Sequence, residues 1–342
     1  MTIHIGLIGG GNISRTHAGA TTAIPDAKIS AVYGVNLEKV ATLCHEFGGR
    51  PFEDFHAFLA HRPMEMVIIG SPSGLHAEQG IAAARHGLHV LVEKPIDIST
   101  ERADALIVAC EQANVKLGVI FQDRFTSDIR RIRQLMLQDA LGRVLLADAR
   151  VKWYRPPEYY SGSRWRGTWA LDGGGALMNQ GVHTVDLLLW LLGDVVSLRA
   201  RTATTLHRIE TEDTALALLE FASGAMGVLE ATTAAFPGYP RRVELTGTEG
   251  TLVLEHDRIV VADLKSRPLN LIRHDPQDRN ASASSPLITD CRGHQLAIED
   301  FVGAIQADAA PACDGHEGRR SVALIESIYR ASQTPELSVR VS

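Results

Sequence analysis

Cysteine is scarce in this chain and is badly spaced for any covalent or metal-bound framework. The 342 residues include only 4 cysteines, separated by long, irregular gaps and never arranged as CxxC. Zinc sites and disulfide scaffolds need clustered or regularly paired cysteines. The histidines at 45, 56, 61 and 294 also lack metal-ligand spacing. We therefore expect no metal site and no disulfides, and a reducing compartment, for which the cytoplasm is the default.

Long apolar runs and an excess of positive charge are missing as well. No window holds ~18 uninterrupted apolar residues, which a membrane-spanning helix requires, and the start "MTIHIGLIGGG" does not resemble a signal peptide. The formal net charge is -6, so a broad nucleic-acid surface is not expected. The basic run "RRIRQ" at 130–134 is interpreted as a solvated helix face. We expect neither a membrane nor a nucleic acid as partner.

The first part of the chain alternates short apolar strands with helical stretches. "IHIGLIG" at 3–9 and "MEMVIIGSP" at 64–72 are strands of continuous apolar type, and helices follow them. Strands that are apolar on both faces are typical of a parallel sheet covered by helices on both sides. The length of the whole chain suits two domains, and we assign the first of them to residues 1–122.

The pattern changes after residue 122. "VVSLRARTATT" at 195–205 alternates apolar and polar residues, and further strands are expected to turn at Ser223-Gly224 and Glu249-Gly250. Residues 123–342 therefore predict a second α/β domain with an open, mainly antiparallel sheet. Helices at 175–193 and 294–306 are expected to cover one of its faces, and the polar stretch 264–290 is interpreted as a loop or lid.

The stretch "GGGNIS" at 9–14 has the pattern of a dinucleotide-binding turn. It follows the first strand directly and opens the first helix, with Gly9 for the tight turn, Gly11 for close approach of the pyrophosphate and Ser14 as the small third residue. The free N–H groups at the helix start would then face the phosphates. Residues 1–122 are predicted to bind NAD or NADP.

The residue that distinguishes NAD from NADP is not decisive here. An acidic residue at the end of the second strand would hold the ribose 2′-hydroxyl of NAD, but this chain has Gly34 there. Asn36 could bond that hydroxyl without charge, and Lys39 is the nearest basic residue. NAD is slightly favoured, and NADP stays open.

An apolar strand, "HVLVEKPID" at 89–97, ends in Glu93, Lys94 and Pro95. Ligands of open α/β sheets bind at the carboxyl ends of the strands. Lys94 is therefore predicted to face the nicotinamide and its substrate.

Four motifs together resemble the glucose-fructose oxidoreductase/inositol dehydrogenase/rhizopine-catabolism (Gfo/Idh/MocA) family. They are "GLIGGGNISRTHA", "SPSGLHAE" at 71–78, "EKPID" at 93–97 and "GGGALMNQGVHTVDLLLWLLG" at 173–193. The resemblance covers essentially the whole chain. It implies an N-terminal Rossmann domain, a C-terminal α/β domain with an open antiparallel sheet, and an NAD(P)-dependent oxidoreductase acting on CH–OH groups.

The resemblance also implies the catalytic residues. Lys94 looks like the family's active-site lysine and His183 like its catalytic histidine. Asn179 stands where inositol dehydrogenases carry an aspartate and some sugar-nucleotide 3-dehydrogenases an asparagine. On physical grounds, Asn179 and His183 are four residues apart and should share a helix face, and Asp186 could orient the His183 ring.

Cofactor and substrate residues are expected around these motifs. The cofactor set is Gly9, Gly11, Asn12, Ile13, Asn36, Ser71, Pro72, His76, Glu93 and Lys94. The substrate set is Arg124, Lys152, Tyr154, Trp165, Arg166, Asn179 and His183, with Gln122, Tyr159 and Arg164 as further candidates. Several members of either set could equally brace the structure, as His76 would by capping its helix.

The predicted reaction is hydride transfer between a ring hydroxyl of a sugar or inositol and the nicotinamide. Two alternatives stay open: a redox-neutral, NAD-dependent glycosidase of the same family, and a non-catalytic NAD(P)-binding regulator. The substrate is expected to be a small carbohydrate or cyclitol. The single-sided sheet of the second domain implies a covered face, and the resemblance implies that another subunit covers it, in a homodimer or homotetramer.

Overall fold

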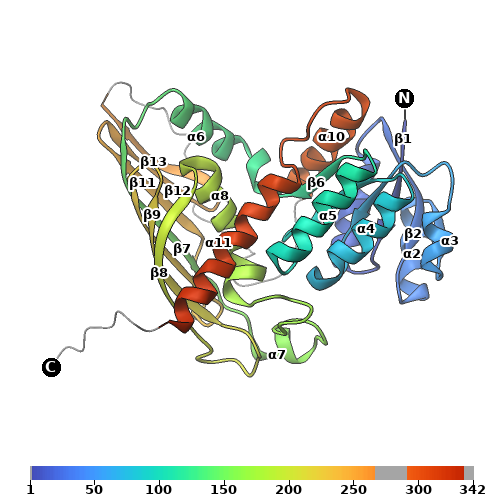
Figure 1. Cartoon of the computed structure of the whole chain (residues 1–342), viewed down its shortest axis with the longest axis horizontal. Helices are drawn as coiled ribbons and strands as arrows, with labels where there is room; N and C mark the ends of the chain where they lie inside the picture. The colour runs from blue at the N-terminus through green and yellow to red at the C-terminus, as the bar shows by residue number, and fades with distance from the viewer. Residues whose placement is uncertain (1, 266–290, 335–342) are drawn as a thin grey trace. The chain divides into compact units, whose positions relative to one another are not determined.

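The computed structural model describes residues 2–265 and 291–334, and the chain forms two compact units (Figure 1). The first unit comprises Met1–Phe125 and Ile288–Val322, and the second comprises Thr126–Leu287 and Ala323–Ser342. The sequence did not predict that a late segment returns to the first unit. The stretch expected to form a loop or lid, 264–290, lies almost entirely outside the described residues.

The first unit is built on a six-stranded sheet in the order β3-β2-β1-β4-β5-β6. All its neighbouring strands run parallel, which is the doubly wound order of a dinucleotide-binding sheet. The strands are β1 (Ile3–Ile8), β2 (Ala27–Tyr33), β3 (Arg50–Phe52), β4 (Met66–Ile69), β5 (His89–Glu93) and β6 (Leu117–Ile120).

Helices cover both faces of this sheet, as the apolar strands predicted. α4 and α5 pack side by side (Figure 1), whereas α1 contacts α2 and α10. The helices are α1 (Asn12–Thr22), α2 (Leu37–Phe47), α3 (Phe55–Leu59), α4 (His76–Arg85), α5 (Thr100–Gln112) and α10 (Arg292–Gln306), with 3-10 turns η1 (Ser73–Leu75) and η2 (Gln122–Phe125). Ser99 is the N-cap of α5, because Ser99 Oγ accepts a hydrogen bond from the Arg102 amide.

The helix expected at 294–306 forms as α10 but belongs to the first unit, so its assignment to the second domain was wrong. Its apolar stripe, with Ile298, Phe301 and Val302, joins the core that β1 and β4 also line. Gly118 of β6 makes room for it, since a Cβ on Gly118 would lie 2.6 Å from the Phe301 ring. Helical periodicity shows which face of α10 is apolar, but it does not show which of two sheets that face covers.

The second unit contains a seven-stranded sheet in the order β13-β12-β11-β7-β10-β9-β8. Only β7 and β10 pair in parallel, so the sheet is mainly antiparallel, as expected. The strands are β7 (Val144–Lys152), β8 (Val195–Ala203), β9 (Thr214–Phe221), β10 (Met226–Thr232), β11 (Arg242–Gly247), β12 (Gly250–Glu255) and β13 (Arg258–Leu264). The turns predicted after β9 and β11 are both present.

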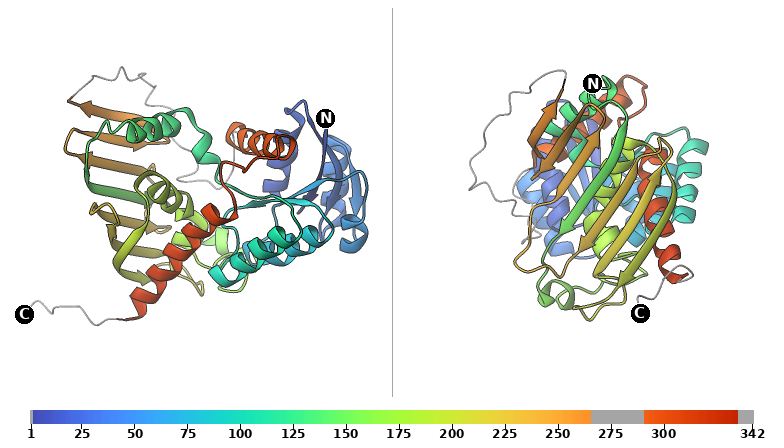
Figure 2. Two further views of the ribbon diagram at one scale, coloured as in Figure 1. Left: turned by 45° about the horizontal axis from the view of Figure 1, so that its top comes forward. Right: turned by 90° about the vertical axis from the view of Figure 1, so that its left-hand side faces the viewer.

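One face of this sheet carries the helices of the second unit, and the other faces the viewer uncovered in the right-hand view of Figure 2. The helical segments are α6 (Ser127–Leu137), α7 (Pro157–Ser161), the π-helix η3 (Ala176–Gly181), α8 (Val182–Leu192) and α11 (Gly315–Gln333), whose residues divide between the two units. Along β9 buried Ala217 and Leu219 alternate with exposed Leu216 and Leu218. The open face is therefore partly apolar.

Because α10 packs into the core of the first unit, the stability of the protein should depend on the apolar side chains of this helix. Phe301→Ala should lower the free energy of unfolding by about 3–5 kcal/mol, because a large buried ring is removed from the first unit's core. Gly303→Ala on the same helix is the control and should raise it by up to about 1 kcal/mol, since a Cβ there meets no atom within 4 Å. Urea unfolding followed by circular dichroism measures both. Equal stability of Phe301→Ala and the wild type would contradict the packing described.

Candidate active site

The turn after β1 has the backbone that a dinucleotide needs. Gly9 has φ +128°, and a Cβ there would lie 2.6 Å from Ser14 Oγ and 2.9 Å from the Gly70 carbonyl oxygen, so only glycine fits. Gly11 caps α1 without any side-chain hydrogen bond, and a Cβ on it would meet nothing within 4 Å. The first amides of α1, starting at Asn12, therefore stay open to a pyrophosphate. These residues fit the dinucleotide.

The end of β2 is shaped by packing against this turn. A Cβ on Gly34 would lie 3.0 Å from Val40 Cγ2 and 3.3 Å from the Gly10 amide nitrogen, which leaves little room for an acidic side chain. Asn36 caps α2, because its Oδ1 accepts a hydrogen bond from the Lys39 amide at 3.0 Å. Asn36 Nδ2 could still donate to a ribose hydroxyl, and Oδ1 keeps a second lone pair that could accept from one.

His76 braces two loops at the carboxyl ends of β4 and β5. It is buried, with Nδ1 2.8 Å from the Pro95 carbonyl oxygen and Nε2 3.0 Å from that of Ser71. Burial lowers its pKa, although both carbonyl contacts oppose that shift. Ser71 Oγ donates to Gln79, and Pro72 precedes the short turn η1. These contacts give His76 a structural task beside the expected cofactor path.

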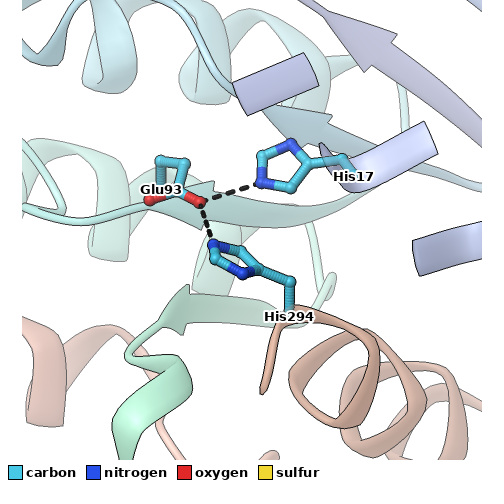
Figure 3. Close-up of side chains that lie close together, drawn as sticks. All are labelled: His17, Glu93 and His294. Atoms are coloured by element: carbon cyan, nitrogen blue, oxygen red, sulfur yellow. Dashed lines mark hydrogen bonds and ion pairs between the residues drawn. The ribbon is translucent and has the colours of Figure 1, made fainter. Parts of the chain in front are cut away.

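Glu93, the last residue of β5, lies at the centre of a buried cluster (Figure 3). Its Oε1 is 2.8 Å from His17 Nε2 and 3.5 Å from His294 Nε2, and its Oε2 accepts a hydrogen bond from the Lys94 amide at 3.1 Å. Burial alone would raise the pKa of Glu93, but the two histidines together outweigh it and hold that pKa well below its usual range. Burial lowers the pKa of His17, against the effect of the Glu93 hydrogen bond.

Sequence reasoning missed two members of this cluster. His17 lies within a quoted motif but received no role, and His294 was interpreted as ordinary. Their distance along the chain hides the connection, because they come from α1 and α10 while Glu93 comes from β5. A motif histidine at a helical position facing the sheet was the only available signal.

In the second unit, the helix expected at 175–193 is divided in two. Ala176–Gly181 forms a π-helix, and α8 begins at Val182. Asn179 lies in the π-helical segment and half-buried His183 in the first turn of α8, so the regular α-helical face expected for this pair does not describe them. Asp186 is buried one turn further along α8. π-helical segments often occur at functional sites.

A buried carboxylate, Glu212, holds the start of this π-helix. Its Oε2 accepts a hydrogen bond from the Gly175 amide at 3.0 Å, and its Oε1 accepts from the Leu177 amide at 2.7 Å and the Tyr329 hydroxyl at 3.0 Å. A Cβ on Gly174 would lie 2.1 Å from the Tyr329 oxygen, and one on Gly175 would lie 2.0 Å from the Glu212 carbonyl oxygen. This packing explains the glycine-rich "GGG" before the predicted helix.

Asn179 is part of a polar network within the second unit. Its Nδ2 donates to Asp172 Oδ1 at 2.5 Å, and its Oδ1 accepts from Gln180 Nε2 at 2.7 Å. Gln180 also donates to the Tyr159 hydroxyl at 3.0 Å and accepts from buried Arg155 at 2.7 Å. Asp172 and Gln180 received no role in the sequence analysis. Asp172 nevertheless brings a carboxylate into hydrogen-bond contact with Asn179, whose own side chain is an amide.

The predicted substrate residues of the second unit have different partners. The Arg166 guanidinium lies 4.1 Å from the centre of the Tyr159 ring and 5.4 Å from that of Trp165, near the Asn179 network. Tyr154 packs edge-on against Phe236. Lys152 forms an ion pair of 2.6 Å with Glu230.

Two of the predicted residues have other partners. Lys152 lies two residues beyond Arg150 on β7, so both point to the open face of the sheet and away from buried Val151. Arg124 is buried in the first unit, where it lies 3.2 Å from Glu317. These contacts favour structural roles for Lys152 and Arg124.

Comparisons with known proteins agree with this architecture. Residues 3–121 match the oxidoreductase family with an NAD-binding Rossmann fold, and residues 129–253 match the GFO/IDH/MocA C-terminal domain. The chain belongs to the Gfo/Idh/MocA family of oxidoreductases. Its first domain is therefore an NAD-binding Rossmann domain, as the fingerprint at 9–14 predicted.

Named relatives include several sugar and inositol dehydrogenases. The crystal structure of the WlbA dehydrogenase from Bordetella pertussis, in complex with NADH and UDP-GlcNAcA, is similar with a TM-score of 0.87 and 35% identity, covering 97% of this chain and 96% of that one. Inositol 2-dehydrogenase from Rhizobium meliloti is 25% identical over 97% of each chain. Levoglucosan dehydrogenase from Pseudarthrobacter phenanthrenivorans is 28% identical over 75% of this chain and 74% of its own.

No helix within the described ranges 2–265 and 291–334 is long and apolar enough to cross a membrane.

The position of Glu212 predicts a pH dependence of stability. Burial raises the pKa of Glu212 from an ordinary 4.5 to about 7, even though its hydrogen bonds oppose the shift. The folded state therefore holds this proton more tightly, and a stabilisation of roughly 3 kcal/mol that is complete below pH 4.5 is lost as the pH rises through 7. In urea unfolding across this pH range, the free energy of unfolding should decline less steeply in Glu212→Gln than in the wild type.

The control is Glu210→Gln, because exposed Glu210 also accepts a backbone hydrogen bond, from the Trp169 amide. Its unfolding free energy should follow the wild-type pH profile. Parallel profiles for all three proteins would contradict the assignment to Glu212.

Proposed function

We propose that this protein oxidises a ring hydroxyl of a sugar or cyclitol, reversibly, with NAD as hydride acceptor. The observation that carries the proposal is Lys94, which directly follows β5 at the carboxyl end of the NAD-binding sheet. Ligands of such sheets bind at this edge. An ammonium group there can stabilise the oxygen of a hydroxyl that is losing its proton.

His183 is the proposed general base. The reaction breaks an O–H and a C–H bond of the same alcohol and forms a C=O bond. His183 takes the hydroxyl proton, for which a histidine is well suited near neutral pH, while Lys94 stabilises the developing alkoxide. Bound NAD supplies the acceptor for the hydride.

Asn179 is the proposed ligand of a substrate hydroxyl. Its side chain is held on both sides, by Asp172 and Gln180, so it is oriented before a substrate arrives. The carboxylate of Asp172 accepts from its amide and polarises it. The negative charge of Asp172 is thus one hydrogen bond away from Asn179, and the asparagine alone would not reveal it.

The substrate class is proposed to include sugars that carry an acidic group. Arg166, stacked on Tyr159 beside the Asn179 network, combines an aromatic face with a planar donor that suits carboxylate or phosphate. The 35% identity to a dehydrogenase crystallised with UDP-GlcNAcA supports the same class. Free sugars and inositols are the second candidates, supported by the relatives of that specificity.

We also propose a homodimer or homotetramer that covers the open sheet face of the second unit. Leu146 and Met226 are paired across β7 and β10 on this face, with Leu218 on the neighbouring strand β9, and all are more than half exposed. Contiguous exposed apolar surface of this kind is typical of an interface.

A reducing compartment, with the cytoplasm as the default, stays part of the proposal. All four cysteines are free thiols in the structure. Proteins of oxidising compartments more often pair their cysteines.

The activity is tested by following NAD and NADP reduction at the nicotinamide absorbance over a panel of nucleotide-sugar acids, free sugars, inositols and glycosides. We expect turnover with one class and NAD, with kcat reduced about 10²–10⁴-fold in His183→Ala and in Lys94→Ala because each removes a group that acts in the transition state. NADH binding, measured by fluorescence, should persist in His183→Ala.

Other outcomes separate the alternatives. Cleavage of a glycoside without net NADH would favour the redox-neutral glycosidase. Tight NADH binding with no chemistry on any member of the panel would favour the regulator. Either result would contradict the proposed dehydrogenase.

The interface is tested by light scattering after gel filtration. Leu218→Glu should shift the protein to a smaller species, because a charge buried at an interface costs several kcal/mol. Leu137→Glu, at the exposed end of α6, is the matched control and should leave the mass unchanged. A monomeric wild type would exclude the proposed assembly.

A further inference from the structure

The cluster of His17, Glu93 and His294 joins distant segments at one buried point of the first unit (Figure 3). The side chains are 1%, 8% and 4% exposed, respectively. Both imidazoles direct Nε2 toward the same carboxylate oxygen, Oε1 of Glu93. No role of His17 or His294 follows from the proposed chemistry, yet three buried titratable groups in contact are costly unless they satisfy one another.

The distances identify a hydrogen-bonded cluster. Two atoms bound to one tetrahedral zinc ion at about 2.0–2.1 Å would lie roughly 3.3 Å apart. The His17 Nε2 to Glu93 Oε1 distance is 2.8 Å, which is a normal hydrogen-bond length and too short for two ligands of that ion. Because a carboxylate can only accept, His17 must carry its proton on Nε2.

The other oxygen of the same carboxylate bonds the residue proposed to act in catalysis. Glu93 Oε2 accepts from the backbone amide of Lys94. The carboxylate is thus fixed at one oxygen by α1 and α10 and at the other by the residue that carries the proposed catalytic ammonium group. Loosening either histidine frees Glu93 to turn, and the backbone amide of Lys94 then loses this acceptor.

We propose that His17 and His294 are positioning residues that act through Glu93 to fix Lys94. The inference rests on the proposed function for the role of Lys94, but the contacts themselves do not depend on it. His294 also makes the returning helix α10 part of the active site's support.

The first test needs no substrate. Lys94 is methylated with formaldehyde and cyanoborohydride, and its rate is compared with that of exposed Lys28 in the same sample by peptide mass spectrometry. His17→Phe and His294→Phe remove the donor but keep a ring, and should raise the relative rate about threefold as the turn opens locally. His17→Gln and His294→Gln keep a donor near the Nε2 position and should restore the wild-type labelling rate of Lys94.

His89→Asn is the matched control. His89 begins the same strand β5 and accepts a hydrogen bond from the Lys116 amide at the opposite end. The His89→Asn substitution should leave Lys94 labelling unchanged. Thermal unfolding of each variant shows whether a Phe variant has failed to fold, and the Gln variants then decide the question.

The second test uses NAD and the sugar that gives turnover in the panel. The Phe variants should lower kcat about 10-fold with little change in the KM for NAD, because a small misplacement of a catalytic group slows the chemical step. In a Lys94→Ala background the same substitutions should have no further effect on kcat. If no sugar is turned over, the proposed function fails while the labelling result still decides this inference.

Three results would overturn the inference. The first is unchanged Lys94 labelling in well-folded Phe variants, and the second is a Phe substitution that lowers kcat by the same factor in the Lys94→Ala background as in the wild type. The third is stoichiometric zinc in the purified protein that is lost in His17→Phe.

Discussion

A buried carboxylate must be surrounded by donors, and this requirement organises both units of the protein. Glu93 in the first unit and Glu212 in the second are each almost inaccessible to solvent. Each accepts backbone hydrogen bonds from the segment that carries a proposed catalytic residue: Glu93 from Lys94 itself, and Glu212 from the residues that lead into the π-helix before His183. The same interaction therefore orients both halves of the proposed chemistry.

The two carboxylates are stabilised differently, and their ionisation differs accordingly. Histidines on two sides keep the pKa of Glu93 low, so its negative charge persists at neutral pH. Among the described residues, the partners of Glu212 are backbone amides and a tyrosine hydroxyl, and burial raises its pKa to about 7. The Glu93 carboxylate therefore keeps its charge near neutral pH, whereas the Glu212 carboxyl changes its protonation there.

Much of the fold could be predicted from local patterns. Continuous apolar strands indicated the parallel sheet, alternating strands the antiparallel one, and Gly9 and Gly11 the dinucleotide turn. These predictions succeeded because strand type and turn geometry depend on a few neighbouring residues. The placement of α10 failed for the opposite reason: its apolar stripe fits either sheet, and only packing against β1 and β4 selects the first.

The sequence by itself determined most of the backbone elements and the cofactor turn, and it supplied the candidates Lys94, Asn179 and His183, because each lies within a short stretch. Tertiary structure alone decided what holds them. His17 and His294 meet Glu93 across long separations in the chain, and Asp172 places a carboxylate behind Asn179. A side chain's partners depend on which segments the whole core brings together, and no local pattern contains that information.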